Sequence, residues 1–376
     1  MIRRYKELDS LRGIAAFSVF VFHILMVFPD SWREKITWNV LNLSPLHFFF
    51  TGKQHVILFF VLSGYVLSLV FFSRNKISYF PFILKRVIRL FIPYVVAITV
   101  AIFLCSMLSK GGIATLGNLL NTSWVEPLNK KIILEHYLFI GNYNIYAINV
   151  VIWTLIHEMR ISFIIPILVL LSIRYGWKIN LAIGAMLGML GGGVHFFLQD
   201  PYQPIYKTLF YILMFMVGIL LSKNSIILTS KYNALSQKNK FVLFLVGTIL
   251  FIYADFIKLP LLTDWVTTLG VAILLIISIS STLVSKVLLW SPLQFMGKIS
   301  YSLYLYHFPI LLSLFYILHG AVPILIIAIL SIILTIGIST LAWTVVENPS
   351  IKLGNYLSKK LINIQSQTIV DKQKLS

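Results

Sequence analysis

The feature that most constrains this chain is a series of ten long apolar runs. A bilayer core about 30 Å thick needs about 20 apolar residues in a helix. The runs cover residues 8–28, 56–72, 82–108, 150–173, 177–198, 205–221, 241–257, 262–284, 299–318 and 321–346. Because 59% of the residues are hydrophobic and only 11% are charged, an ordinary soluble domain is excluded. We therefore predict an all-α integral membrane protein with about ten transmembrane helices.

The charged residues predict how the chain is oriented in the membrane. The net charge is +19, but the basic residues are scattered between the apolar runs and form no single patch, so nucleic acid is not an expected partner. If the N-terminus lies inside, 22 of the 31 basic and 4 of the 12 acidic residues lie on the inner side. This excess predicts cytoplasmic termini in the cell (inner) membrane. We expect one transmembrane domain over residues 1–350 and a short polar cytoplasmic tail over residues 351–376.

The first apolar run contains an arginine and a histidine. An ionisable side chain in the bilayer core costs about 3 kcal/mol or more and usually faces a cavity or a partner. Arg12 and His23 are 11 residues apart, which places them on nearly the same helical face and about 16 Å apart along the axis. In one interpretation both serve a site inside the membrane. In the other, Arg12 extends to lipid headgroups and His23 is structural.

The segment WTLIHEMR carries a second polar group, and its Trp153 is expected to line a cavity or to contact the substrate. Glu158 is expected a little over one turn from the outer surface, at a depth similar to that of His23. A carboxylate at that level can hold an imidazole and favour one tautomer, as in hydrolytic triads. The alternative is that Glu158 pairs with the nearby Arg160 for stability alone.

Arg86 and Arg89 form a third candidate group near the inner end of their span. They are three residues apart and so share a helical face. Two guanidinium groups in that position can bind a phosphate through paired hydrogen bonds. The alternative is ordinary enrichment of basic residues on the cytoplasmic side.

Two further spans carry small or polar residues. Ser63 and Gly64 permit a close approach of helices or line a cavity. Tyr301, Tyr304 and His307 recur every three residues, so they drift slowly around one face of their helix. Such a stripe usually packs, but polar groups at that depth also suit a water-lined or ligand-lined cavity.

The remaining polar segments are less specific. The longest outer loop, residues 109–149, contains tyrosines and asparagines that suit sugar contacts, and equally suit any loop. Glu347 ends the last span, where salt bridging is the default. No metal site is predicted, since Glu135, His136 and His157 lack a ligand spacing typical of metal sites.

The motifs resemble those of the membrane-bound acyltransferase-3 family, whose members are integral-membrane O-acyltransferases of bacterial surface glycans. The resemblance covers nearly the whole chain. It lies in ELDSLRGIAAFSVFVFH, with ten residues between the arginine and the histidine, in FFVLSGYVLS, in the paired arginines of KRVIR, and in WTLIHEM, GKISYSLYLYHFPI and ENP. In WTLIHEM, Thr154 stands where serine is commoner, and His157 and Arg160 depart from many relatives.

The resemblance implies transfer of an acyl group, usually acetyl from cytosolic acetyl-CoA, to a hydroxyl of a glycan or lipid-linked glycan. It implies that His23 is the catalytic histidine and that Arg12, Arg86 and Arg89 serve the acyl donor or the active site. Some relatives carry a hydrolase-like domain outside the membrane, so a separate extracytoplasmic transferase is a possible partner.

The sequence therefore predicts a membrane O-acyltransferase that acts on an exported or surface polysaccharide, with His23 as general base or as acyl carrier. Three alternatives stay open: a transporter of an anionic solute, a non-enzymatic scaffold, and the same chemistry with another acyl group or a small-molecule acceptor. The transporter is disfavoured because the sequence shows no inverted repeat and no pair of broken helices.

Overall fold

The computed structural model describes residues 5–375, apart from residues 33–43, 73–77, 199–201 and 203. In the described part each of the ten apolar runs falls mainly on one helix. These helices are α1 (Lys6–Val27), α3 (Gly52–Phe72), α4 (Tyr79–Leu108), α7 (Ile152–Arg174), α8 (Trp177–Leu198), α9 (Ile205–Lys223), α11 (Gln237–Ile252), α12 (Pro260–Ser280), α14 (Ser291–Leu318) and α15 (Ile324–Ala342). The prediction of an all-α integral membrane protein is confirmed.

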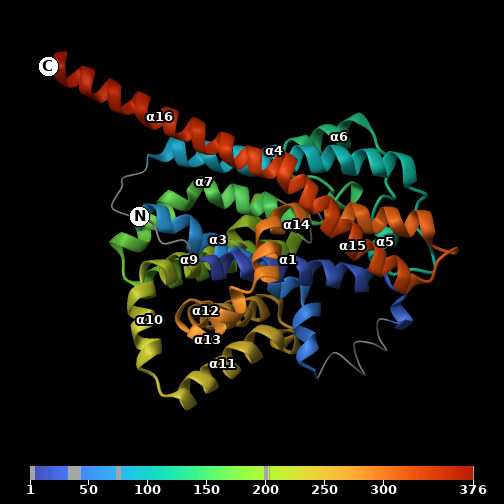
Figure 1. The fold of residues 1–376 in the computed structure, drawn as a ribbon, viewed down its shortest axis with the longest axis horizontal. Coiled ribbons are helices and arrows are strands. Elements are labelled where there is room, and N and C mark those ends of the chain that lie inside the picture. Colours follow the sequence, from blue (N-terminus) through green and yellow to red (C-terminus); the bar gives the residue numbers. More distant parts are fainter. Residues whose placement is uncertain (1–4, 33–43, 73–77, 199–201, 203, 376) are drawn as a thin grey trace.

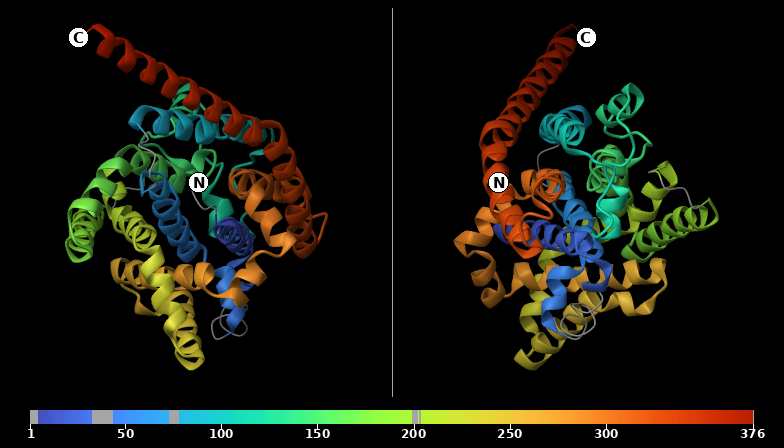
Figure 2. Two further views of the ribbon diagram at one scale, coloured as in Figure 1. Left: turned by 60° about the vertical axis from the view of Figure 1, so that its left-hand side comes forward. Right: turned by 90° about the vertical axis from the view of Figure 1, so that its right-hand side faces the viewer.

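Shorter helices and one long terminal helix connect or extend this bundle. They are η2 (Pro45–Phe50), α5 (Asn118–Thr122), α6 (Lys130–Tyr137), η3 (Ile145–Ala147), α10 (Ser225–Ala234), η4 (Ala254–Ile257), α13 (Thr282–Leu288), η5 (Trp343–Glu347) and α16 (Asn348–Leu375). The segment expected as a polar tail therefore belongs to helix α16. In Figure 2, α16 runs along α4 and then extends past the bundle.

Nine helices among the described residues are long and apolar enough to cross a membrane. The exception among the ten runs is residues 241–257, which form the 16-residue helix α11 and then η4. At 1.5 Å per residue α11 is about 24 Å long, which is shorter than a bilayer core. Helix α11 ends at Ile252, and the chain continues into η4, which is followed by Lys258 with a left-handed φ of 54°.

The two ends of the bundle carry different segments. The start of α1, the end of α16 and α10 lie at one end, which we call the N-terminal end (Figure 1). Helices α5 and α6 of the long loop lie at the opposite end, which we call the far end (Figure 1). This arrangement agrees with termini on one side of the membrane, while the assignment of that side to the cytoplasm stays a prediction.

Helix α14 lies at the centre of the packing. In its most apolar stretch 78% of the residues are buried, against 22% for α8. Helix α1 packs closely on α14 because Gly13 and Gly297 face each other. A Cβ atom added to Gly13 would lie 2.6 Å from the carbonyl carbon of Met296. This contact holds the turn of α1 that carries Arg12 against the start of α14.

We expect Gly297→Ala to destabilise the protein, because the added methyl group would meet the backbone of Asp9. Overpacking of this kind costs about 1–3 kcal/mol. Thermal unfolding of the purified protein in detergent measures the loss. Gly337→Ala is the matched control, since nothing lies within 4 Å of a Cβ there. Equal melting temperatures for the two variants would contradict the close contact.

Candidate active site

A cavity of about 570 Å³ lies among α1, α3, α4, α7, α14 and η5. Sites for small molecules in proteins commonly have volumes of roughly 300–1,000 Å³. Among the described residues, seven charged side chains line the cavity: Arg12, Arg86, Arg89 and Lys298, together with Asp9, Glu158 and Glu347. Charged groups inside a transmembrane bundle are costly and mark functional sites. The cavity is therefore the leading candidate for a ligand site.

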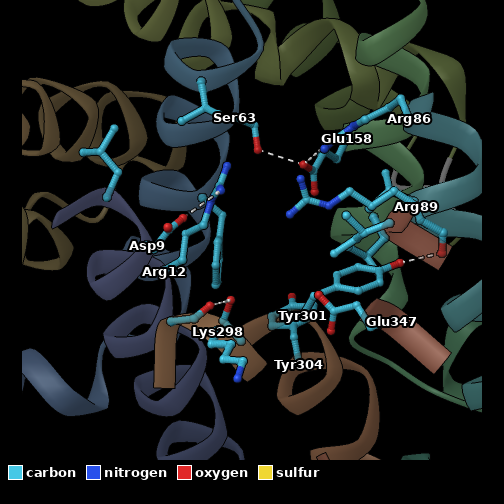
Figure 3. Close-up of a pocket in the computed structure, with 18 of the residues that line it drawn as sticks. Asp9, Arg12, Ser63, Arg86, Arg89, Glu158, Lys298, Tyr301, Tyr304 and Glu347 are labelled. Carbon is cyan, nitrogen blue, oxygen red and sulfur yellow. Dashed lines mark hydrogen bonds and ion pairs between the residues drawn. The ribbon is translucent and has the colours of Figure 1, made fainter. Parts of the chain in front are cut away.

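The three predicted arginines come together in this cavity. Arg12 of α1 and Arg89 of α4 point into it from opposite sides (Figure 3). Nη1 of Arg12 lies 3.9 Å from Oδ1 of Asp9, one turn earlier in the same helix. Because the cationic groups outnumber the carboxylates, the cavity suits an anionic ligand better than a cationic one.

Arg86 is held differently from the other two arginines. Its Nη2 forms an ion pair with Oε1 of Glu158, and its Nε donates to Oγ of Ser162 at 3.3 Å. Oγ of Ser63 donates to the same carboxylate oxygen at 2.8 Å. The side chains of Arg86 and Glu158 are only 9% and 16% exposed. The ion pair thus neutralises two charges that would otherwise be costly in this environment.

The expected partnership of Glu158 with His23 is wrong in this structure. Glu158 lies beside the guanidinium group of Arg86. A hydrogen bond between two charged groups stabilises the carboxylate more strongly than a hydrogen bond from a neutral imidazole would. The alternative, an ion pair with Arg160 alone, does not describe the site either. Arg160 donates to the backbone oxygens of Ile140 and Gly141, at 2.8 and 2.6 Å.

Glu347 is positioned by a wide helical turn. It ends η5, a π-helical turn between α15 and α16, and such turns recur at functional sites. Its Oε2 accepts from the backbone N and the Oγ of Ser302, at 3.2 and 2.6 Å. Nζ of Lys298 lies 3.9 Å from the centre of the Trp343 ring in the same turn. Trp343 and Glu347 of this turn both line the cavity.

Two tyrosines of the predicted polar stripe line the cavity. The hydroxyl of Tyr301 donates to the backbone oxygen of Leu90 at 2.8 Å. The hydroxyl of Tyr304 accepts from Oγ1 of Thr154 at 2.9 Å. The two tyrosines therefore both pack against neighbouring helices and line the cavity. Ser63 lines the cavity as well. Its neighbour Gly64 lets α3 approach the backbone of Phe215 in α9.

His23 and His307 lie together next to the Tyr304 ring. Nδ1 of His23 is 2.9 Å from Nε2 of His307, and the two rings lie within 18° of parallel with centres 5.2 Å apart. The rings of Tyr304 and His307 are 5.7 Å apart. The residues that line the cavity include Tyr304 but neither histidine. The ring of Tyr304 thus contacts both the arginine-lined cavity and the histidine pair.

Trp153 also lies away from the cavity lining. It packs against Phe60, His157 and Tyr211, with ring centres 5.7–6.3 Å from its own. Nδ1 of His157 lies 2.9 Å from Oγ1 of Thr208. The structure therefore places Trp153 in an aromatic cluster beside the site, where it supports the helix that carries Glu158.

The histidine of the long loop has a structural position. His136 is buried in α6, and its Nδ1 lies 2.8 Å from the backbone oxygen of Ile132. Burial lowers the pKa of His136 to about 4, so the ring is neutral at neutral pH. Within the described ranges, no three side chains of His, Cys, Asp or Glu gather as metal ligands would.

A second hollow, of about 410 Å³, lies at the far end. It is lined by Asn118, Thr122, Asn144, Tyr146 and Tyr202. The backbone N of Gly117 donates to the oxygen of Val27 at 2.9 Å, which fixes this part of the loop over the end of α1. The hollow is thus anchored to the helix that carries His23, close to where that helix ends.

Three residues that line the cavity are not predicted from the sequence: Asp9, Lys298 and Thr154. Asp9 precedes Arg12 by three residues, a spacing that does indicate a shared helical face. Lys298 is adjacent to Gly297, and its place at the cavity follows from the close contact of α1 and α14, which no local pattern indicates.

The fold and the cavity together define a multi-pass membrane protein with a charged internal site for a small ligand. Residues 5–344 match the sequence profile of the acyltransferase-3 family, described as an acyltransferase domain. Because the match covers most of the chain, the protein belongs to that family. The resemblance seen in the sequence motifs is confirmed.

Two curated proteins are similar in sequence. Peptidoglycan O-acetyltransferase OatA of Listeria monocytogenes is 26% identical over 380 residues, which cover 94% of this chain and 57% of the relative. O-acetyltransferase PaAT-1 of Phomopsis amygdali is 30% identical over 122 residues, or 29% of this chain and 24% of the relative. The chain thus spans little more than half of the Listeria protein. No solved structure matches it.

Proposed function

We propose that this protein transfers an acyl group, most simply acetyl, from cytosolic acyl-CoA to a hydroxyl of an exported or surface polysaccharide. The observation that carries the proposal is that α1 carries Arg12 at the cationic cavity and His23, the partner of His307, eleven residues further along. Both similar proteins are named as O-acetyltransferases, which supports the acetyl group and an oxygen acceptor.

The cavity suits the charged end of an acyl-CoA. Phosphate oxygens can accept hydrogen bonds from Arg12, Arg89 and Lys298, which line the cavity. The cavity also has a volume typical of a small-molecule site. The thioester supplies an activated acyl group. The distance from Arg12 to His23 along the helix is about 16 Å. The slender arm that joins the phosphates of an acyl-CoA to its thioester can span this distance. We place the phosphates at the arginines and the thioester toward Tyr304.

The imidazole of His23 supplies a base for the acceptor. As the hydroxyl oxygen bonds to the acyl carbon, the carbon–sulfur bond breaks, and the hydroxyl proton passes through the imidazole to the leaving thiolate. A positioned base contributes roughly 10²–10⁴-fold to such a transfer. In the second route His23 itself carries the acyl group before the acceptor takes it.

The acceptor is proposed to arrive from the far end. The polar hollow there is lined by asparagine, threonine and tyrosine, whose amides, hydroxyls and rings suit contacts with sugar hydroxyls. The loop segment that lines it is tied to the end of α1 by the hydrogen bond from Gly117 to Val27. The hollow therefore lies over the end of the helix that carries His23.

The direct test is a thiol-release assay on the full protein in lipid vesicles. With acetyl-CoA and soluble peptidoglycan fragments, we expect free coenzyme A and acetylated fragments in equal amounts. Mass spectrometry of surface glycans from cells with and without the protein extends the test to other acceptors. Passage of an anionic solute across the vesicle without thiol release would favour a transporter and contradict the proposal.

We expect Arg89→Gln to weaken donor binding. A hydrogen bond to a charged group is worth about 1.5–3 kcal/mol, so KM for acetyl-CoA should rise about tenfold or more, with a smaller change in kcat. Initial rates of thiol release over a range of donor concentrations measure both constants. Arg174→Gln is the matched control, because Arg174 ends α7 away from the cavity lining. An unchanged KM in Arg89→Gln would remove the arginine from the donor site.

A further inference from the structure

The two histidines form a pair with a defined order of atoms. Nδ1 of His23 faces Nε2 of His307 at 2.9 Å. Nδ1 of His307 in turn faces the backbone oxygen of Leu303 at 3.1 Å, four residues earlier in α14. The two ring nitrogens of His307 therefore face different groups: Nδ1 faces backbone carbonyl oxygen, and Nε2 faces an imidazole.

The carbonyl decides where the proton of His307 lies. A carbonyl oxygen only accepts hydrogen bonds, so Nδ1 of His307 must carry a proton to make this contact favourable. A neutral imidazole carries one ring proton, so Nε2 of His307 then accepts. It can accept only if Nδ1 of His23 donates.

A charged His307 would donate at both nitrogens, but its surroundings oppose a charge. The side chain is fully buried, and its ring neighbours are Phe20, Tyr304 and His23. None of these offers a carboxylate, and an unpaired charge among such rings is costly. The neutral arrangement is therefore the one that satisfies both contacts.

We propose that His307 is a positioning residue that holds the proton of His23 on Nδ1, so that Nε2 of His23 presents its lone pair to the reaction. This inference rests on the proposed function for its catalytic consequence, but the order of protons stands on geometry alone. Both routes of transfer need it, since Nε2 either takes the acceptor proton or attacks the acyl carbon. In either route Nδ1–H stays bonded to His307.

The test uses two amide variants of different length. In His307→Gln the side-chain oxygen can reach the position of Nε2 and accept from His23. In His307→Asn it reaches only the position of Nδ1, near the Leu303 oxygen. We expect kcat to stay within about tenfold of wild type for Gln and to fall roughly 10²-fold for Asn, with KM for acetyl-CoA unchanged in both.

Equal losses of kcat in the two variants, at equal melting temperature, would show that His307 merely packs and would overturn the proposal. A second measurement needs no activity. In the full-length protein labelled with ¹⁵N-histidine, we expect NMR to show His23 protonated at Nδ1 and unprotonated at Nε2, with a mixture of tautomers in His307→Asn. A wild-type His23 that carries its proton on Nε2 would also overturn it. If the tautomers are as expected but no thiol is released, the proposed function fails and the proton order does not.

Discussion

His23→Ala protein should insert and fold normally yet lose nearly all transfer, with kcat lower by roughly 10²–10⁴-fold. The reason is that the substitution removes the lone pair on which either route depends, while the arginines that hold the donor remain. KM for acetyl-CoA should change little, because His23 lies beyond the residues that line the cavity. Thiol release and acetylated product, measured on the same samples, check the prediction.

His319→Ala is the matched control, since His319 lies at the end of α14 and contacts Thr115 of the loop. It should keep wild-type kcat. Full activity of a folded His23→Ala protein would refute both routes. The routes separate without an acceptor: a burst of thiol with acetyl recovered on His23 indicates the carrier, and its absence at saturating donor indicates the base.

Glu158→Leu should give the second large effect, this time on stability. The substitution leaves Arg86 buried without its carboxylate, and breaking a buried ion pair from one side costs about 3–5 kcal/mol. The melting temperature in detergent should fall well below that of wild type. Donor binding should weaken as well, because the released guanidinium is free to leave its position at Ser162.

The double variant Arg86→Met with Glu158→Leu separates stability from function. With both charges gone, most of the lost stability should return, since no unpaired charge remains. Activity should stay low, because the cavity then lacks one of its cationic groups. A Glu158→Leu protein as stable as wild type would show that the ion pair contributes nothing to the fold.

Local patterns predicted the helices and much of the cavity. Apolar runs of about 20 residues leave the backbone no alternative to helix in a bilayer, so the elements followed from length alone. The spacing of Arg86 and Arg89 placed both on one face, and the structure brings them to the same cavity as Arg12. Tyr301 and Tyr304 likewise followed from a three-residue spacing.

The partners of the charged residues could not be predicted in the same way. Glu158 and His23 lie at similar depths in the membrane when residues are counted from the end of each span, and this count predicts that they are neighbours. The actual pairs, Arg86 with Glu158 and His23 with His307, depend on how four helices are arranged in three dimensions. Contacts between residues so distant in sequence leave no periodic signal. The same holds for Lys298, which reaches the cavity through the contact of Gly13 with Gly297.

The most direct measurement of the central claim supplies donor and acceptor on opposite faces of the membrane. The full protein is reconstituted in vesicles of one orientation, with the face that carries the N-terminal end toward acetyl-CoA labelled in its acetyl group. The soluble glycan acceptor is confined to the other compartment. We predict labelled acetyl on the glycan and coenzyme A left on the donor side, both lost in His23→Ala. Transfer only when donor and acceptor share one compartment would contradict the account.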